Sequence, residues 1–141
     1  MNSELLKSTL RSPSAENERL KPYVDTVGKM TIGVGRNLTD NGIRKSESEF
    51  MLDNDVTDVV AQVGTLPCWH ALSDVRQRVI AEMCFQLGFA GVKAFKKMFA
   101  AIDEGNFADA ADEMLDSQWA TQTPNRAHRL SQMMRLNQDL V

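Results

Sequence analysis

Apolar residues in the second half of the chain recur every three or four positions, which is the spacing of an amphipathic helix. The clearest run comprises Val75, Val79, Ile80, Met83, Cys84 and Leu87, followed by Gly88. Ser73, Asn106 and Thr123 each precede a helical run and are residue types that favour N-caps. Pro124 then suits a first helical position. The pattern predicts an all-helical lobe over about residues 66–141.

The first third of the chain lacks this period. Residues 23–35 mix β-branched and aromatic residues with three glycines. This composition predicts two short strands that form a β-hairpin around Val27 and Gly28. Residues 37–42 have the composition of a loop.

A long helix is predicted after the hairpin. Ser46 and Glu49 form a capping-box pattern, and helical spacing continues to about residue 63. Pro67 disfavours helical dihedrals at Leu66 and so ends the helix. The apolar positions that can share one face are Phe50, Val56, Val59, Val60 and Val63.

Together these elements predict an α+β fold in a single domain. It has a small N-terminal lobe (about 13–45) with the hairpin, a connecting helix (about 46–63) and the larger helical lobe. A first helix over about residues 3–11 should stop because Ser12 precedes Pro13. This helix is expected to pack on the helical lobe, and a cleft between lobes is a natural ligand site.

Composition narrows the class of protein. The chain has 141 residues, a net charge of −3 and two cysteines. Two cysteines are too few for a disulfide scaffold, and the acidic balance argues against a nucleic-acid binder. No apolar stretch approaches the ~18 residues of a membrane span, and the N-terminal residues lack the apolar middle of a secretory signal. We therefore expect folding in a reducing cytoplasm, without membrane insertion.

A metal site is not predicted. Cys68 and His70 stand close together, but no second Cys/His pair follows at ligand spacing. We expect the protein to need no cofactor.

Two carboxylates near the start are candidates for chemistry. Glu16 precedes the predicted strands, and Asp25 lies on the first strand or in its turn. Cleavage of a glycosidic bond requires two carboxyl groups in unlike environments, one protonated and one ionised. Spacing alone does not distinguish such a pair from two solvated surface acids, which are far more common.

A longer motif surrounds the two carboxylates. It reads Glu16-Asn17-Glu18-Arg19-Leu20-Lys21-Pro22-Tyr23-Val24-Asp25-Thr26, then Gly28, then Thr31-Ile32-Gly33-Val34-Gly35. This segment resembles the catalytic segment of phage-type lysozymes, the endolysins of glycoside hydrolase family 24. A second set is similar to the helical lobe of T-even bacteriophage members of that family: Phe85-Gln86-Leu87-Gly88, and later Trp119 with Gln122-Thr123-Pro124-Asn125-Arg126. The matches follow the family's order and cover most of the chain.

The resemblance implies a role for each matched residue. Glu16 falls on the general acid, Asp25 on the second carboxylate, and Thr31 on the hydroxyl beside the attacking water. Arg126 falls on the arginine that pairs with the catalytic glutamate. The other matches fall on the wall of the cleft or behind it: Gln86, Trp119, Gln122 and Asn125. For Trp119, a position in the core fits the sequence equally well.

The implied activity is hydrolysis of the β-1,4 bond between N-acetylmuramic acid and N-acetylglucosamine in bacterial peptidoglycan, with inversion. Such an endolysin is a bacteriolytic, antimicrobial muramidase. It is expected to wait in the host cytoplasm as a monomer until a separate membrane pore protein releases it, causing cytolysis.

Two alternatives remain open. One is a catalytically impaired module on the same fold that only binds the cell wall. The other is a lytic transglycosylase, against which the presence of both Asp25 and Thr31 argues. A helical interaction protein of an unrelated class would show no lytic activity.

The chain departs from the family pattern around Glu16. Asn17 stands where the family has glycine, and asparagine is a common substitute at positive φ. Because the first helix should end near Arg11, a loop is expected to hold Glu16. Arg36 stands where many relatives have histidine, and we expect this change to affect stability rather than chemistry.

Overall fold

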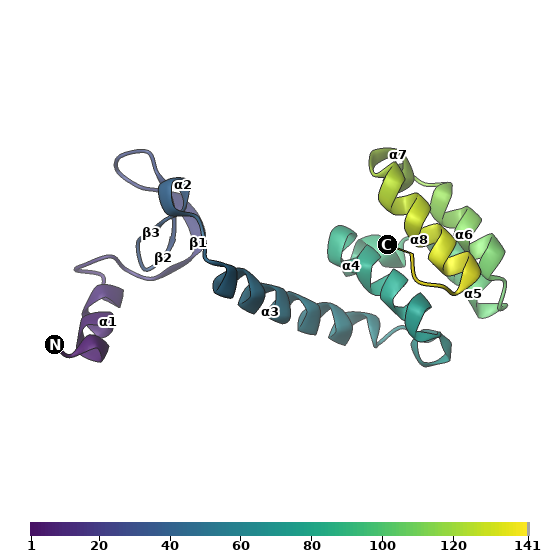
Figure 1. The fold of residues 1–141 in the computed structure, drawn as a ribbon, viewed down its shortest axis with the longest axis horizontal. Coiled ribbons are helices and arrows are strands. Elements are labelled where there is room, and N and C mark those ends of the chain that lie inside the picture. Colours follow the sequence, from purple (N-terminus) through teal and green to yellow (C-terminus); the bar gives the residue numbers. More distant parts are fainter. Residues whose placement is uncertain (141) are drawn as a thin grey trace. The chain divides into compact units, whose positions relative to one another are not determined.

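The computed structural model describes residues 1–140, so the last residue of the predicted helical lobe, Val141, lies outside the described residues. The chain divides into two compact units, called here the N-terminal unit (Met1–Met51) and the C-terminal unit (from Leu52 onward). The N-terminal unit contains α1 (Ser3–Arg11), β1 (Arg19–Val24), β2 (Met30–Gly33), β3 (Arg36–Asn37), α2 (Leu38–Asn41) and the start of α3 (Lys45–Val63) (Figure 1).

The C-terminal unit is helical. After α3 come a short 3₁₀ helix (Trp69–Ala71), α4 (Asp74–Lys93), α5 (Lys96–Asp103), α6 (Phe107–Leu115), α7 (Gln118–Gln122) and α8 (Pro124–Leu136). A small antiparallel sheet followed by these helices confirms the predicted α+β class. Within the described residues, no helix has the length and apolar character needed to cross a membrane.

The sheet has three antiparallel strands in the order β1-β2-β3. Val24 faces Met30 and Tyr23 faces Thr31, so the predicted hairpin is confirmed, with Gly28 in its turn at φ +84°. The third strand was not predicted because it has only two residues, Arg36 and Asn37.

Residues 38–41 correct the sequence prediction. They were expected to be part of a loop but form α2. Asn37 is the N-cap: its side-chain oxygen accepts the Asp40 N–H at 3.0 Å. Asparagine and aspartate favour both loops and helix starts, and composition alone favoured the wrong one.

The long helix α3 also begins earlier than predicted. Ser46, the expected N-cap, lies inside the helix, since the Ser48 N–H already donates to the Arg44 carbonyl. Its end at Val63 is as predicted. Of the apolar positions expected on one face, Val63 is buried, Val59 is half-buried, and the others are exposed: Phe50, Val56 and Val60.

A two-pronged ion pair joins β3 to the first turn of α3. The two terminal nitrogens of Arg36 donate to the two carboxyl oxygens of Glu47 at 2.7 and 3.0 Å. The guanidinium lowers the pKa of Glu47, mainly through these hydrogen bonds. Arg36 thus has a structural partner, in keeping with the expectation that it affects stability.

We expect Arg36→Gln to lower the thermal midpoint at pH 7, with a difference from wild type that shrinks in acid. A carboxyl whose pKa is lowered by folding stabilises the protein above its unfolded pKa and loses that effect as pH falls through the folded value. Thermal unfolding of both proteins between pH 7 and pH 3 measures this difference in midpoint. Lys45→Gln, at an exposed position, is the control. A difference that stays constant with pH would contradict the assignment.

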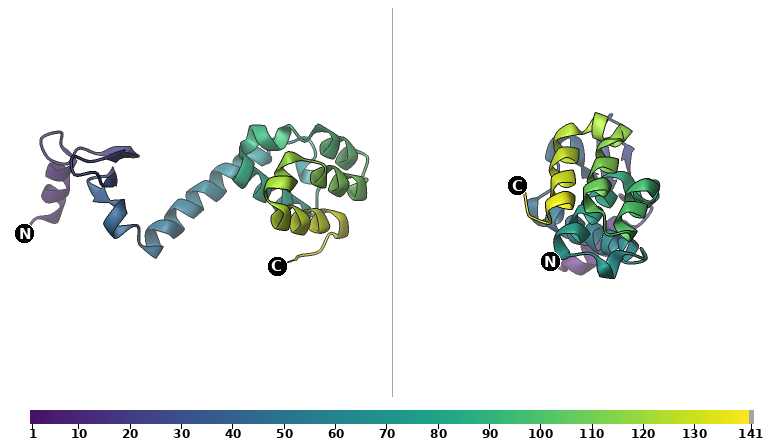
Figure 2. Two further views of the ribbon diagram at one scale, coloured as in Figure 1. Left: turned by 90° about the horizontal axis from the view of Figure 1, so that it is seen from above. Right: turned by 90° about the vertical axis from the view of Figure 1, so that its right-hand side faces the viewer.

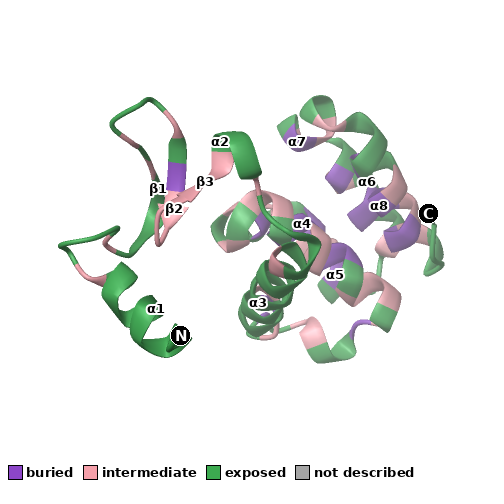
Figure 3. Ribbon diagram, turned by 60° about the vertical axis from the view of Figure 1, so that its left-hand side comes forward, coloured by how far each residue is buried: buried purple, intermediate pink, exposed green. Residues whose placement is uncertain are grey.

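The hydrophobic core lies in the C-terminal unit. Figure 2 shows its helices gathered together, with α6 packed against α5 and α8. The largest fully buried apolar side chains are Ile80, Met83, Met98, Met114, Leu130 and Met134. In the N-terminal unit, by contrast, Thr31 is the one buried residue, and α1 buries none (Figure 3).

Local capping rules hold in most of the C-terminal unit. The side chains of Ser73 and Asn106 accept the N–H groups of Arg76 and Asp109, as predicted. Thr123 differs. It occupies the N-cap position of α8, but its hydroxyl donates to the Trp119 carbonyl at 3.1 Å and accepts no N–H of α8.

Candidate active site

Glu16 lies in a turn that folds back on the end of α1. Its N–H donates to the Leu10 carbonyl at 3.2 Å, and the Asn17 N–H donates to the Ser12 carbonyl at 3.1 Å. Asn17 has φ +59°. This confirms the expectation that asparagine replaces a glycine at a position of positive φ. α1 ends at Arg11, so the prediction that a loop holds the acid is confirmed.

The Glu16 side chain rests against Gly35. A Cβ built on Gly35 would lie 2.5 Å from Glu16 Oε2 and 2.8 Å from Glu16 Cδ. Gly35 also has φ +68°, a backbone conformation that residues other than glycine rarely adopt. The glycine therefore leaves the space in which the carboxyl group lies. Gly35 belongs to the motif that ends the catalytic segment, but the sequence alone did not indicate its contact with Glu16.

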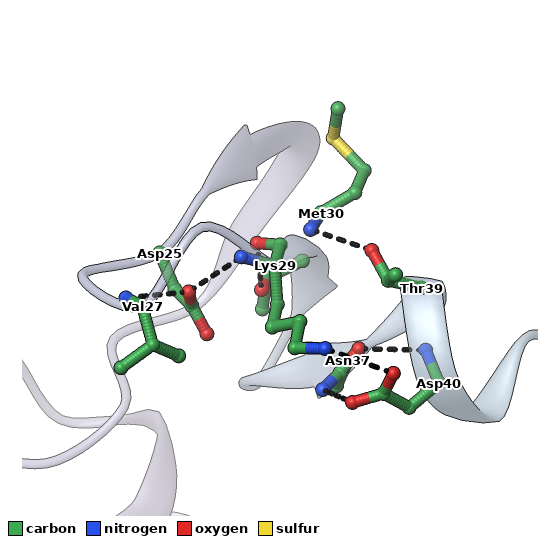
Figure 4. Close-up of polar contacts among 8 residues, drawn as sticks. Asp25, Val27, Lys29, Met30, Asn37, Thr39 and Asp40 are labelled. Carbon is green, nitrogen blue, oxygen red and sulfur yellow. Dashed lines mark hydrogen bonds and ion pairs between the residues drawn. The ribbon is translucent and has the colours of Figure 1, made fainter.

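Asp25 is fixed by the turn between β1 and β2. Its Oδ1 accepts the N–H groups of Val27 at 3.0 Å and Lys29 at 2.8 Å (Figure 4). Its own N–H donates to the Lys29 carbonyl at 2.9 Å. Within Met1–Met51 no hydrogen bond reaches Oδ2, so the carboxylate is oriented and keeps one oxygen available.

Thr31 lies on β2 and is 4% exposed. Its hydroxyl donates to the Lys29 carbonyl at 3.0 Å. Because a hydroxyl has a single hydrogen, Thr31 can only accept a further hydrogen bond, for instance from a water molecule. The N-terminal unit thus supplies all three predicted catalytic residues, from one turn after α1, the β1–β2 turn and β2.

Trp119 and Gln86 form a pair inside the C-terminal unit. Trp119 is 4% exposed and packs edge-on against Phe95, with ring centroids 6.0 Å apart. Its indole N–H donates to Gln86 Oε1 at 2.8 Å, and Gln86 Nε2 donates weakly to Thr123 Oγ1 at 3.5 Å. Trp119 is therefore a core residue that Gln86 holds in place. Gln122 and Asn125 are exposed.

Gln86→Ala is expected to cost about 1–3 kcal/mol of stability, because the buried indole N–H of Trp119 loses its acceptor. Urea unfolding followed by tryptophan fluorescence measures the loss. Gln122→Ala, at an exposed position in the same unit, should stay within about 0.5 kcal/mol of wild type. Equal stability of Gln86→Ala and wild type would show that the bond contributes nothing.

Two of the arginines of α8 share one carboxylate. Arg126 Nε lies 3.3 Å from Glu82 Oε1, and Arg129 is paired with the same oxygen. Glu82 was not among the predicted site residues; its position four residues before Gln86 on α4 was the available signal. The expected pairing of Arg126 with Glu16 stays a prediction.

Among residues 1–140, no group of three or more His, Cys, Asp and Glu side chains is arranged to hold a metal ion. Cys68 and Cys84 are free, and burial raises the pKa of both thiols. The chemistry that the candidate residues of the N-terminal unit offer is that of two carboxyl groups and a hydroxyl.

Comparison with known proteins gives one consistent result. The family model described as phage lysozyme matches residues 13–135. "Probable T4-type lysozyme 2" of Dictyostelium discoideum is 32% identical, with 82% of this chain aligned to 85% of that protein. "Probable T4-type lysozyme 1" of the same organism is 30% identical over the same shares. The "Pre-baseplate central spike protein Gp5" of Enterobacteria phage T4 is 30% identical, with 84% of this chain aligned to 26% of that protein.

Proposed function

Because the chain belongs to the phage lysozyme family, we propose that it hydrolyses the β-1,4 bond between N-acetylmuramic acid and N-acetylglucosamine in peptidoglycan. The family supports a lysozyme-like action on peptidoglycan. The exact bond is our proposal. The observation that supports hydrolysis is the orientation of the Asp25 carboxylate. Two main-chain N–H groups donate to its Oδ1, and its Oδ2 is left available for a water molecule.

In the proposed reaction Glu16 is the general acid. It donates its proton to the leaving glycosidic oxygen as the bond to the anomeric carbon breaks. Asp25, ionised, accepts a proton from the attacking water through Oδ2. The water oxygen bonds to the anomeric carbon and keeps its second hydrogen. Thr31 accepts a hydrogen bond from that hydrogen, since the Thr31 hydroxyl already donates to the Lys29 carbonyl.

The expected stereochemical course is inversion. In an inverting glycosidase a water molecule attacks from the face opposite the leaving group, and the two carboxyl groups have separate tasks as acid and base. A hydroxyl that can only accept a hydrogen bond suits the orientation of such a water. Arg126 would favour the ionised form of the acid once the proton has left.

We place this activity in the lysis of a bacterial host. The protein would act as a monomer without cofactor, remaining in the host cytoplasm until a membrane pore protein gives it access to the wall. It would bind peptidoglycan strands, would not bind nucleic acid and would not insert into a membrane.

The test uses purified peptidoglycan digested by the full chain in ¹⁸O water. Hydrolysis predicts muropeptides with reducing ends that carry ¹⁸O, and inversion predicts that the α anomer forms first. Asp25→Asn, which keeps the size of the side chain, should release none. Products with 1,6-anhydro ends would identify a transglycosylase. Retention on the wall without release of products would identify a binding module.

A further inference from the structure

The turn that carries Asp25 has no apolar support. Thr26, Val27 and Gly28 at its tip are exposed, so its shape depends on polar contacts. The centre of these contacts is the main chain of Lys29. Its N–H donates to Asp25 Oδ1 at 2.8 Å, and its carbonyl accepts from the Asp25 N–H at 2.9 Å and from Thr31 Oγ1 at 3.0 Å. The N–H and the carbonyl of Lys29 belong to the two peptide units on either side of its Cα. A displacement of the Lys29 main chain therefore moves both candidate catalytic groups.

Helix α2 holds the same segment from its other side, as Figure 4 shows. Lys29 Nζ donates to Asp40 Oδ1 at 3.1 Å, and the Met30 N–H donates to Thr39 Oγ1 at 2.9 Å. Asp40 is itself fixed by Asn37, whose Nδ2 donates to Asp40 Oδ2 at 2.9 Å. Lys29, just before β2, and Met30, its first residue, are therefore tied to two consecutive residues of α2.

We propose that Lys29 and Asp40, with Thr39, form a clamp through which α2 positions Asp25 and Thr31 for the reaction. The inference rests on the proposed function. Lys29 and Asp40 are positioning residues, because they act on Asp25 and Thr31 through the main chain of Lys29. Their side chains are 39% and 52% exposed, and exposed pairs add little to global stability, so breaking the pair should leave the fold intact.

The expected effect is on turnover. A misplacement of about 1 Å at a reacting group can cost about 100-fold in rate, and the smaller shift that follows loss of one anchor should cost about three- to tenfold. Lys29→Met and Asp40→Ala should each lower kcat by that factor with KM unchanged. The double variant should fall no further, because both single variants remove the same interaction. Lys29→Arg, which keeps the ion pair, should retain wild-type kcat.

Lys7→Met is the matched control. It also removes an exposed lysine ion pair, with Glu4 at 2.7 Å in α1, but touches none of these contacts. Its kcat should equal that of wild type. Equal losses in Lys7→Met and Lys29→Met would overturn the clamp, as would a double variant whose loss is the product of the two single losses.

A second measurement does not depend on activity. Hydrogen exchange of the Val27 and Lys29 amides, both donated to Asp25, should accelerate about threefold or more in Asp40→Ala and stay unchanged in Lys7→Met. Unchanged exchange in Asp40→Ala would overturn the clamp whether or not the enzyme turns over. A wild type that releases no products while its exchange still responds to Asp40→Ala would instead refute the proposed function and leave the clamp standing.

Discussion

Glu16→Gln is expected to lower peptidoglycan turnover by about 10³-fold while the fold and binding to the wall remain. Glutamine has nearly the same shape as glutamate and can occupy the same space against Gly35. It has no proton to give to the leaving oxygen, and general acid catalysis is typically worth about 10²–10⁴-fold. Release of reducing ends from purified peptidoglycan measures the loss, and circular dichroism reports on the fold.

Glu18→Gln is the matched control for this variant. Glu18 lies two residues further along and is exposed, with a single ion-pair contact to Arg11 at 3.6 Å. The same substitution there should leave turnover unchanged. Full activity in Glu16→Gln would remove Glu16 from the mechanism, and equal losses in both variants would point to a general effect of removing a negative charge.

Gly35→Ala is expected to lower activity by about 100-fold, because the new methyl group would take the space now held by the Glu16 carboxyl. A shift of about 1 Å in a catalytic group is enough for such a loss. The positive φ adds a backbone cost of about 1–2 kcal/mol. Thermal unfolding measures the stability cost, and release of reducing ends measures the activity.

Gly33→Ala separates the two effects. Gly33 has the same φ of +68°, but a Cβ built on it meets no atom within 4 Å. This variant should therefore lose comparable stability while retaining turnover. If Gly33→Ala and Gly35→Ala lose activity equally, the cause is backbone strain and not displacement of the Glu16 carboxyl group.

Features set by neighbouring residues were predictable from the sequence. The caps at Ser73 and Asn106 are bonds from a side chain to an N–H three residues on. Asn17 took a positive φ because its side chain tolerates the left-handed region. The end of α1 at Arg11 follows from the proline two residues later.

Features set by contacts between distant residues could not be predicted from the sequence. Gly35 and Glu16 are in contact although nineteen positions separate them in the sequence, and Lys29 and Asp40 are eleven positions apart. No local sequence pattern therefore indicates either contact. Trp119 shows the same limit. A tryptophan suits a core and a sugar platform alike, and only its 4% exposure and its bond to Gln86 identify it as core.

The scarcity of buried side chains in the N-terminal unit has a consequence for engineering. The three candidate catalytic residues lie within 51 residues, of which Thr31 alone is buried. A piece of this size with so little interior cannot offset the entropy lost on folding. The segment Met1–Met51 is therefore not expected to carry the activity into another protein. Grafted without the rest of the chain, it would be unfolded.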